Sequence, residues 1–256
     1  MKSPTGAQVH IFEDLAGLAG AFARELTALA ARRIEEHGLF TLALAGGKTP
    51  APLYRRLNDP EFRDRIPWGQ VKIFFGDERA VPPTHPDSNF KIAWDAWLAE
   101  STIPTESIFR LEGEAEDLAA AAERYSRILT HEVPSGPSGF PSLDLILLGL
   151  GEDGHTVSLF PGTSAVNETL RVVAANDVPQ LDTRRLTLTY PTINSAHEVW
   201  FLATGERKAR RVAQCLGFAP GGEILPAALV HPAGGRAHWW LDRPAALLIP
   251  ESKPLP

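Results

Sequence analysis

The sequence contains a single cysteine, Cys215, which excludes an internal disulfide and a paired-cysteine metal site. It lacks an apolar run near the ~18 residues that a membrane span requires, and its start shows no charged-then-apolar signal segment. The formal net charge is only −6, so no overall basic field attracts nucleic acid or a membrane surface. We therefore expect a cytoplasmic protein with a small-molecule ligand. An anionic ligand would need a local cluster of cations.

The composition is that of an ordinary globular protein, with 44% hydrophobic and 22% charged residues among 256. The 22 prolines and 21 glycines suggest many short loops rather than disorder. No repeat, low-complexity block or composition change marks a boundary, so we expect one domain over residues 1–256.

Apolar runs of strand length alternate with helical patterns along nearly the whole chain. This alternation predicts an α/β fold with a mostly parallel sheet and helices on both faces. The predicted strands are 9–12, 39–44, 71–75, 108–113, 143–149, 170–175, 184–190, 197–204 and 238–241. The predicted helices are one capped by Asp14 and ending near Glu36, one starting at Pro50, one capped by Ser88, one over 116–131 and one starting within 204–216.

The stretch GLGEDGHTVSLFPG, residues 149–162, follows the buried strand 143–149. Its glycines allow a sharp turn where acidic residues and a histidine leave the core. His155 is a candidate general base, because histidine ordinarily titrates at about pH 6.5. Asp153 is a candidate to orient the imidazole or a water molecule. A metal site at these two residues is disfavoured, since no further ligands occur at a recognisable spacing.

Three other polar segments also follow predicted strands. In the first, Gly46, Gly47, Lys48 and Thr49 precede Pro50, which fits the first position of a helix with Thr49 as its cap. Free backbone N–H groups there would form a phosphate cradle. The segment is neither a Walker A loop nor a GxGxxG motif, and taken alone it is better explained as a simple glycine turn into the helix.

The second segment, Gly76-Asp77-Glu78-Arg79, opens a long polar loop in our prediction. Arg79 could bind a phosphate through two guanidinium N–H groups. Asp77 and Glu78 could bind sugar hydroxyls or hold Arg79. In the third segment, which follows strand 197–204, Lys208 lies near a helix start and is a second candidate anion ligand. Since ligands bind at the carboxyl edge of open α/β sheets, we expect these segments to form one site with His155.

In their order and spacing, GGKTP, GDER with HPDSN, GLGEDGHTVSLFPG and TGERKA resemble the 6-phosphogluconolactonases from about Phe12 to Leu248. The resemblance implies a Rossmann-like fold shared with glucosamine-6-phosphate deaminases. It also implies hydrolysis of 6-phosphogluconolactone without metal or cofactor. The expected binding partner is a phosphorylated sugar lactone, and we expect the protein to be a monomer or a weak homo-oligomer.

The resemblance further implies roles for single residues. His155 corresponds to the family's base and Asp153 to its neighbouring acid. Arg79 and Lys208 correspond to residues near the phosphate, and Gly46, Gly47 and Thr49 to the glycine loop. We add Lys48, Asp77 and Asn89 (the last residue of HPDSN) to the expected substrate-binding set. The family's loop usually reads GGSTP, so Lys48 replaces a serine here.

Two other functions compete with lactone hydrolysis. An amino-sugar phosphate deaminase shares the DGH element but usually has an acid in a stretch like FNEP, where this chain has LFPG with Phe160. Phenylalanine cannot relay a proton, which disfavours deamination. A non-catalytic sugar-phosphate sensor usually carries a DNA-binding helix-turn-helix, and the segments before Phe12 and after Ile249 are too short for one. A nucleotide-binding enzyme is disfavoured by the lack of a GxGxxG motif.

Overall fold

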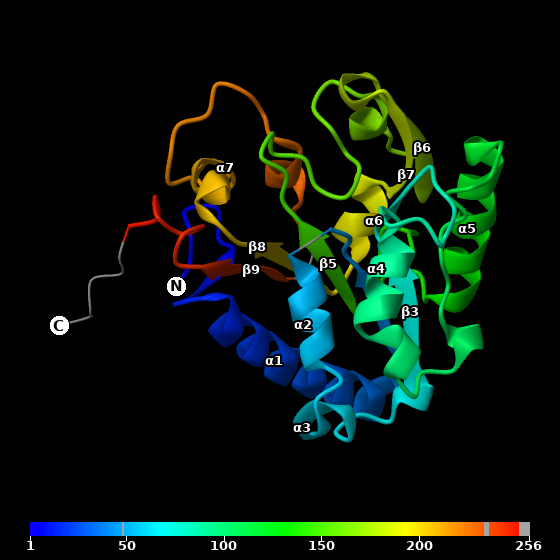
Figure 1. The fold of residues 1–256 in the computed structure, drawn as a ribbon. Helices are drawn as coiled ribbons and strands as arrows, with labels where there is room; N and C mark the ends of the chain where they lie inside the picture. The colour runs from blue at the N-terminus through cyan, green and yellow to red at the C-terminus, as the bar shows by residue number, and fades with distance from the viewer. Residues whose placement is uncertain (48, 233–235, 251–256) are drawn as a thin grey trace.

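The computed structural model describes residues 1–47, 49–232 and 236–250 (Figure 1). Its main sheet has six strands, all parallel, in the order β1-β9-β8-β5-β2-β3. Strands that are distant in sequence are therefore neighbours in the sheet, as crossover connections produce. The strands are β1 Gln8–Phe12, β2 Phe40–Leu44, β3 Val71–Phe75, β5 Leu145–Gly149, β8 Glu198–Ala203 and β9 Arg236–Asp242.

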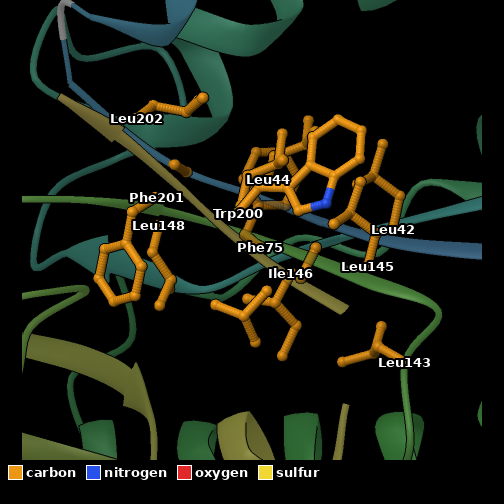
Figure 2. Packing of buried hydrophobic residues seen from close by; sticks show 14 of the residues in the cluster. Leu42, Leu44, Phe75, Leu143, Leu145, Ile146, Leu148, Trp200, Phe201 and Leu202 are labelled. Atoms are coloured by element: carbon orange, nitrogen blue, oxygen red, sulfur yellow. The ribbon is translucent and has the colours of Figure 1, made fainter. Parts of the chain in front are cut away.

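The central strands are apolar on both faces because both faces are covered. Every residue of β2 and the first four residues of β5 are buried. Figure 2 shows Trp200 and Phe201, neighbours in β8, pointing to opposite sides of the sheet. Such continuous burial is typical of parallel sheets between two layers. These strands form a rigid base from which the loops at their carboxyl ends project.

Seven α-helices surround the sheets in the described part of the chain. The longest, α1, begins where the Asp14 carboxylate accepts from the amide of Gly17, and ends at Gly38, whose φ is +77°. Both ends agree with the prediction. Figure 1 shows α5 beside β6 and β7. The helices are α1 Leu15–His37, α2 Pro50–Arg56, α3 Pro60–Arg63, α4 Asn89–Ala96, α5 Leu118–Glu132, α6 Tyr190–Ser195 and α7 Ala209–Cys215.

A second, antiparallel sheet of three strands in the order β4-β7-β6 was not predicted from the sequence. Its strands are β4 Asp77–Arg79, β6 Val173–Val178 and β7 Thr183–Leu188. Short 3₁₀ helices complete the described structure: Trp68–Gln70, Leu98–Glu100, Thr105–Ser107, Ser164–Asn167, Pro179–Leu181, Glu206–Lys208 and Pro226–Leu229.

Several predicted elements differ in the structure. Asp77–Arg79 is a strand rather than part of a polar loop, because it pairs with β7. The strand predicted over 108–113 is wrong, since only Ile108 forms an isolated bridge, to Ile73. The strand predicted from 170 begins at Val173. The predicted last helix starts with the 3₁₀ turn Glu206–Lys208 before α7.

Candidate active site

A cavity of about 320 Å³ lies at the carboxyl ends of β8, β5, β2 and β3, four adjacent strands of the main sheet. All four polar segments singled out from the sequence contribute to it. The lining residues are Ala45, Gly46, Gly47, Thr49, Pro50, Asp77, Arg79, Gly149, Leu150, Gly151, His155, Val157, Leu202 and Lys208. The expected convergence at the carboxyl edge is therefore found, with the second sheet supplying one wall through β4.

His155 and Asp153 form a close pair in the loop after β5. The His155 Nδ1 lies 2.5 Å from the Asp153 Oδ1, and the same oxygen accepts the His155 amide at 3.1 Å. Burial alone would raise the pKa of Asp153, but the hydrogen bond and charge of His155 outweigh it and lower that pKa. An ionised carboxylate only accepts hydrogen bonds, so Nδ1 carries the proton and Nε2 is left as the basic nitrogen.

Glycines make room for this pair. A Cβ on Gly151 would lie 2.1 Å from the His155 Nδ1 and 2.3 Å from the Asp153 Oδ1. The Gly151 amide donates to the His155 carbonyl at 2.8 Å, and the Gly154 amide donates to the Gly151 carbonyl at 3.1 Å. Gly154 has a φ of +89°, which favours glycine. The amides of this turn are thus used to hold the loop.

Two apolar side chains of the same loop shape the site. Phe160 is buried and stacks on the His155 ring, with centroids 4.0 Å apart. Val157, which lines the cavity, has a φ of +45°, a strained conformation for a β-branched residue. Its side chain fits against Gly76, where an added Cβ would be 2.9 Å from Cγ1. Neither contact was foreseen from the sequence, although Phe160 was noted for its chemistry.

Asp77 presents a buried carboxylate at the cavity wall, and both of its oxygens are held. The Ser158 hydroxyl donates to Oδ2 at 2.6 Å, and the Asn89 Nδ2 donates to Oδ1 at 3.0 Å. Ser158 belongs to the stretch 149–162 but was not singled out, because the sequence does not show that its hydroxyl faces a buried carboxylate. These two donors fix the direction in which Asp77 can accept a further hydrogen bond.

Asn89, expected to bind substrate, lies behind the wall instead of in the lining. It is 1% exposed, and a Cβ on Gly46 would lie 1.8 Å from its Oδ1. Glu78 is also buried and accepts from the amides of Asn89 and Phe90 and from the Ser88 hydroxyl. Burial raises the pKa of Glu78, although these hydrogen bonds act to lower it. Glu78 therefore anchors the start of α4 and is not among the residues that line the cavity.

Two cations line the cavity. The Arg79 Nη1 donates to the Asp87 carbonyl at 2.5 Å. Lys208 is half-buried, and burial lowers its pKa despite the charges of Glu152 and Asp153. Its ammonium makes no hydrogen bond or ion pair with a described residue. Lys48, the third predicted cation, lies outside the described residues.

The glycine loop after β2 offers backbone donors to the cavity. Gly46 and Gly47 both line it, and neither amide hydrogen-bonds to a described residue. Thr49 precedes α2 as predicted, but its side chain does not cap the helix. Its Oγ1 lies 3.3 Å from the Thr204 Oγ1 instead, which joins this loop to the loop that carries Lys208.

The described residues contain no group of three or more histidine, cysteine or acidic side chains that could hold a metal ion. They also contain no helix that is long and apolar enough to cross a bilayer.

Comparisons with known proteins agree with the motifs. The family model described as glucosamine-6-phosphate isomerases/6-phosphogluconolactonase matches residues 13–239. A 6-phosphogluconolactonase from Nostoc sp. is 39% identical over 83% of this chain and 85% of its own. The chloroplastic 6-phosphogluconolactonase 3 of Arabidopsis thaliana is 36% identical over 93% of this chain and 74% of its own.

Solved structures share the fold. The 6-phosphogluconolactonase of Trypanosoma brucei superposes with a TM-score of 0.83 at 29% identity, covering 95% of this chain and 99% of its own. A monomeric glucosamine-6-phosphate deaminase has a TM-score of 0.76 at 24% identity over 94% of this chain and 99% of its own, which is a likeness of fold alone. The chain therefore belongs to the glucosamine-6-phosphate isomerase and 6-phosphogluconolactonase family.

Proposed function

We propose that this protein hydrolyses 6-phospho-D-glucono-1,5-lactone to 6-phospho-D-gluconate. The observation that carries the proposal is the His155–Asp153 pair in a cavity that also contains Arg79 and Lys208. The pair provides a base, and the cations suit a phosphorylated substrate. The relatives named 6-phosphogluconolactonase, 35–39% identical to this chain, support the same activity.

In the proposed mechanism, the His155 Nε2 accepts a proton from a water molecule as the water oxygen attacks the lactone carbonyl at C1. The resulting imidazolium then donates this proton to the ring oxygen as the C1–O bond breaks. One water is consumed and His155 returns to its neutral form. Asp153 acts as a positioning residue, because its carboxylate holds the Nδ1 proton and stabilises the transient imidazolium.

The other residues of the cavity would bind the substrate. Arg79 and Lys208 would hold the phosphate, with Gly46, Gly47, Lys48 and Thr49 as the neighbouring loop. The carboxylate of Asp77 would accept a hydrogen bond from a sugar hydroxyl, and Asn89 would position Asp77. The amides of Gly46 and Gly47 make no hydrogen bond with a described residue and would be available to an anionic oxygen, whereas those of Gly151 and Gly154 are already used.

A lactone is reactive by itself, so catalysis needs only part of the ~8–23 kcal/mol that enzymes supply. Positioning of the water molecule, together with a single base, is sufficient to lower the activation free energy by that amount. Deamination would need a side chain that relays a proton near the sugar ring. Where deaminases usually have an acidic residue for this purpose, this chain has Phe160, which stacks on His155. This contact favours hydrolysis over deamination.

The test is a substrate comparison. Freshly prepared 6-phosphogluconolactone is mixed with the protein, and acid release is followed above the spontaneous rate. Ammonia release from glucosamine 6-phosphate is measured in parallel. We expect fast acid release and no ammonia. Ammonia release without lactonase activity would reverse the assignment. The cytoplasmic location, the single domain over 1–256 and the monomeric or weakly associated state stay predictions, and several relatives are named chloroplastic.

A further inference from the structure

Arg185 in β7 lies directly opposite Arg79 in β4, as their Cα atoms are partners in the antiparallel ladder. Opposite residues of such a ladder project from the same face and approach closely. The two arginine side chains therefore leave the sheet from neighbouring positions on one face, and the charge of Arg79 acts on Arg185. Like charges in this arrangement destabilise a sheet.

Within the described part of the chain, neither guanidinium is paired with a carboxylate by a hydrogen bond or an ion pair. The guanidinium of Arg185 makes no hydrogen bond or ion pair with any described residue, and among these residues the guanidinium of Arg79 donates only to the Asp87 carbonyl. Three carboxylates, those of Asp77, Glu78 and Asp87, act on Arg185 through their charge. The oxygens of Asp77 and Glu78 already accept hydrogen bonds from Ser158 and Asn89 and from the start of α4.

Partial burial of Arg185 adds a desolvation cost to the repulsion between the two positive charges. Burial, followed by the charge of Arg79, lowers the pKa of Arg185, although Asp77, Glu78 and Asp87 oppose this change. An arginine that is partly desolvated beside a second cation is well suited to bind an oxyanion, which relieves both costs.

The face that carries the pair also faces the active-site cavity. Asp77 and Arg79, two residues apart in β4, both line the cavity. Thr187, the ladder partner of Asp77, accepts a hydrogen bond from the Ser158 amide in the catalytic loop at 3.2 Å. Because side chains alternate along a strand, Arg185 shares this face with Thr187 and stands beside Arg79, which lines the cavity, although Arg185 itself is not one of the lining residues.

We propose that Arg185 and Arg79 together form a two-guanidinium subsite that binds the phosphate group of the substrate. The identity of that substrate rests on the proposed function. The subsite would add planar paired donors that a lone ammonium such as Lys208 does not provide. It would make Arg185 a residue that determines the preference for phosphorylated over plain lactone.

The test compares Arg185→Gln and Arg185→Lys with the control Arg184→Gln. Arg184 is the neighbouring arginine of β7, it is exposed, and its side chain projects from the opposite face. Two measurements are made: kcat and KM for 6-phosphogluconolactone and for unphosphorylated glucono-1,5-lactone, and the rise in melting temperature caused by inorganic phosphate and by 6-phosphogluconate over gluconate.

We expect Arg185→Gln to raise KM for the phosphorylated lactone about tenfold or more, with no change for the plain lactone. The stabilisation by phosphate should be lost, while Arg184→Gln keeps it. Arg185→Lys retains the charge but not the paired donors, so it should restore only part of both effects. If both Arg185 variants equal the wild type, or affect both lactones equally, the inference is overturned. The phosphate measurement needs no turnover, so it still decides the inference if lactonase activity is absent.

Discussion

The substitution Gly151→Ala isolates the contribution of the His155–Asp153 pair without altering either side chain. The added Cβ would lie 2.1 Å from the His155 Nδ1, 2.3 Å from the Asp153 Oδ1 and 2.4 Å from the His155 Cε1. Real Cβ atoms do not approach other atoms this closely, so the pair must move apart. The φ of Gly151 is not in the left-handed region, so alanine brings no backbone strain of that kind.

The expected size of the effect follows from the contact that is lost. A hydrogen bond that involves a charged group contributes about 1.5–3 kcal/mol. Losing it from the transition state would lower kcat about 10- to 150-fold. Because Asp153 contacts the imidazole rather than the phosphate site, KM should change much less than kcat.

The assay is steady-state hydrolysis of 6-phosphogluconolactone, with the thermal melt as a check on folding. Gly149→Ala is the matched control, because Gly149 also lines the cavity but its Cβ would meet nothing within 4 Å. The control therefore measures the effect of a methyl group in the wall alone. A Gly151→Ala enzyme with the wild-type kcat would refute the assigned role of the pair.

Two further variants test other contacts. Burial lowers the pKa of His238 to about 4; the charges of His10 and Arg236 act in the same direction, and that of Glu198 opposes them. Between about pH 6.5 and pH 4, the His238 imidazole is therefore protonated in the unfolded chain but not in the folded protein. The free energy of unfolding should fall by about 3 kcal/mol as pH falls through this range, and His238→Phe should remove that portion in urea titrations; an unchanged pH slope would contradict this. Phe160→Leu keeps most of the buried volume but not the ring on His155, so we expect a loss of stability below about 1.5 kcal/mol and a several-fold lower kcat, which an unaltered kcat would exclude.

Much of the main sheet could be predicted because its strands are buried on both faces and read as apolar runs. The helix starts at Asp14 and Ser88 were predictable because capping depends on local chemistry. The meeting of the four polar segments followed from the geometry of parallel strands, whose carboxyl ends share one edge of the sheet.

The second sheet could not be predicted in the same way. Asp77–Arg79 is too short and too polar to read as a strand, and it becomes one by pairing with a segment about a hundred residues later. The anchoring role of Glu78 and the pairing of Arg79 with Arg185 both depend on this contact. Sequence patterns identified residues with suitable chemistry, whereas their orientation depended on long-range packing.

The most direct test of the central claim is the turnover of freshly prepared 6-phosphogluconolactone by His155→Gln, compared with the wild type after subtraction of spontaneous hydrolysis. Glutamine keeps polarity at this position but cannot accept the proton of the attacking water. The account predicts a fall in kcat of about a hundredfold or more with little change in KM. A His155→Gln enzyme that keeps the wild-type kcat would contradict histidine-assisted hydrolysis.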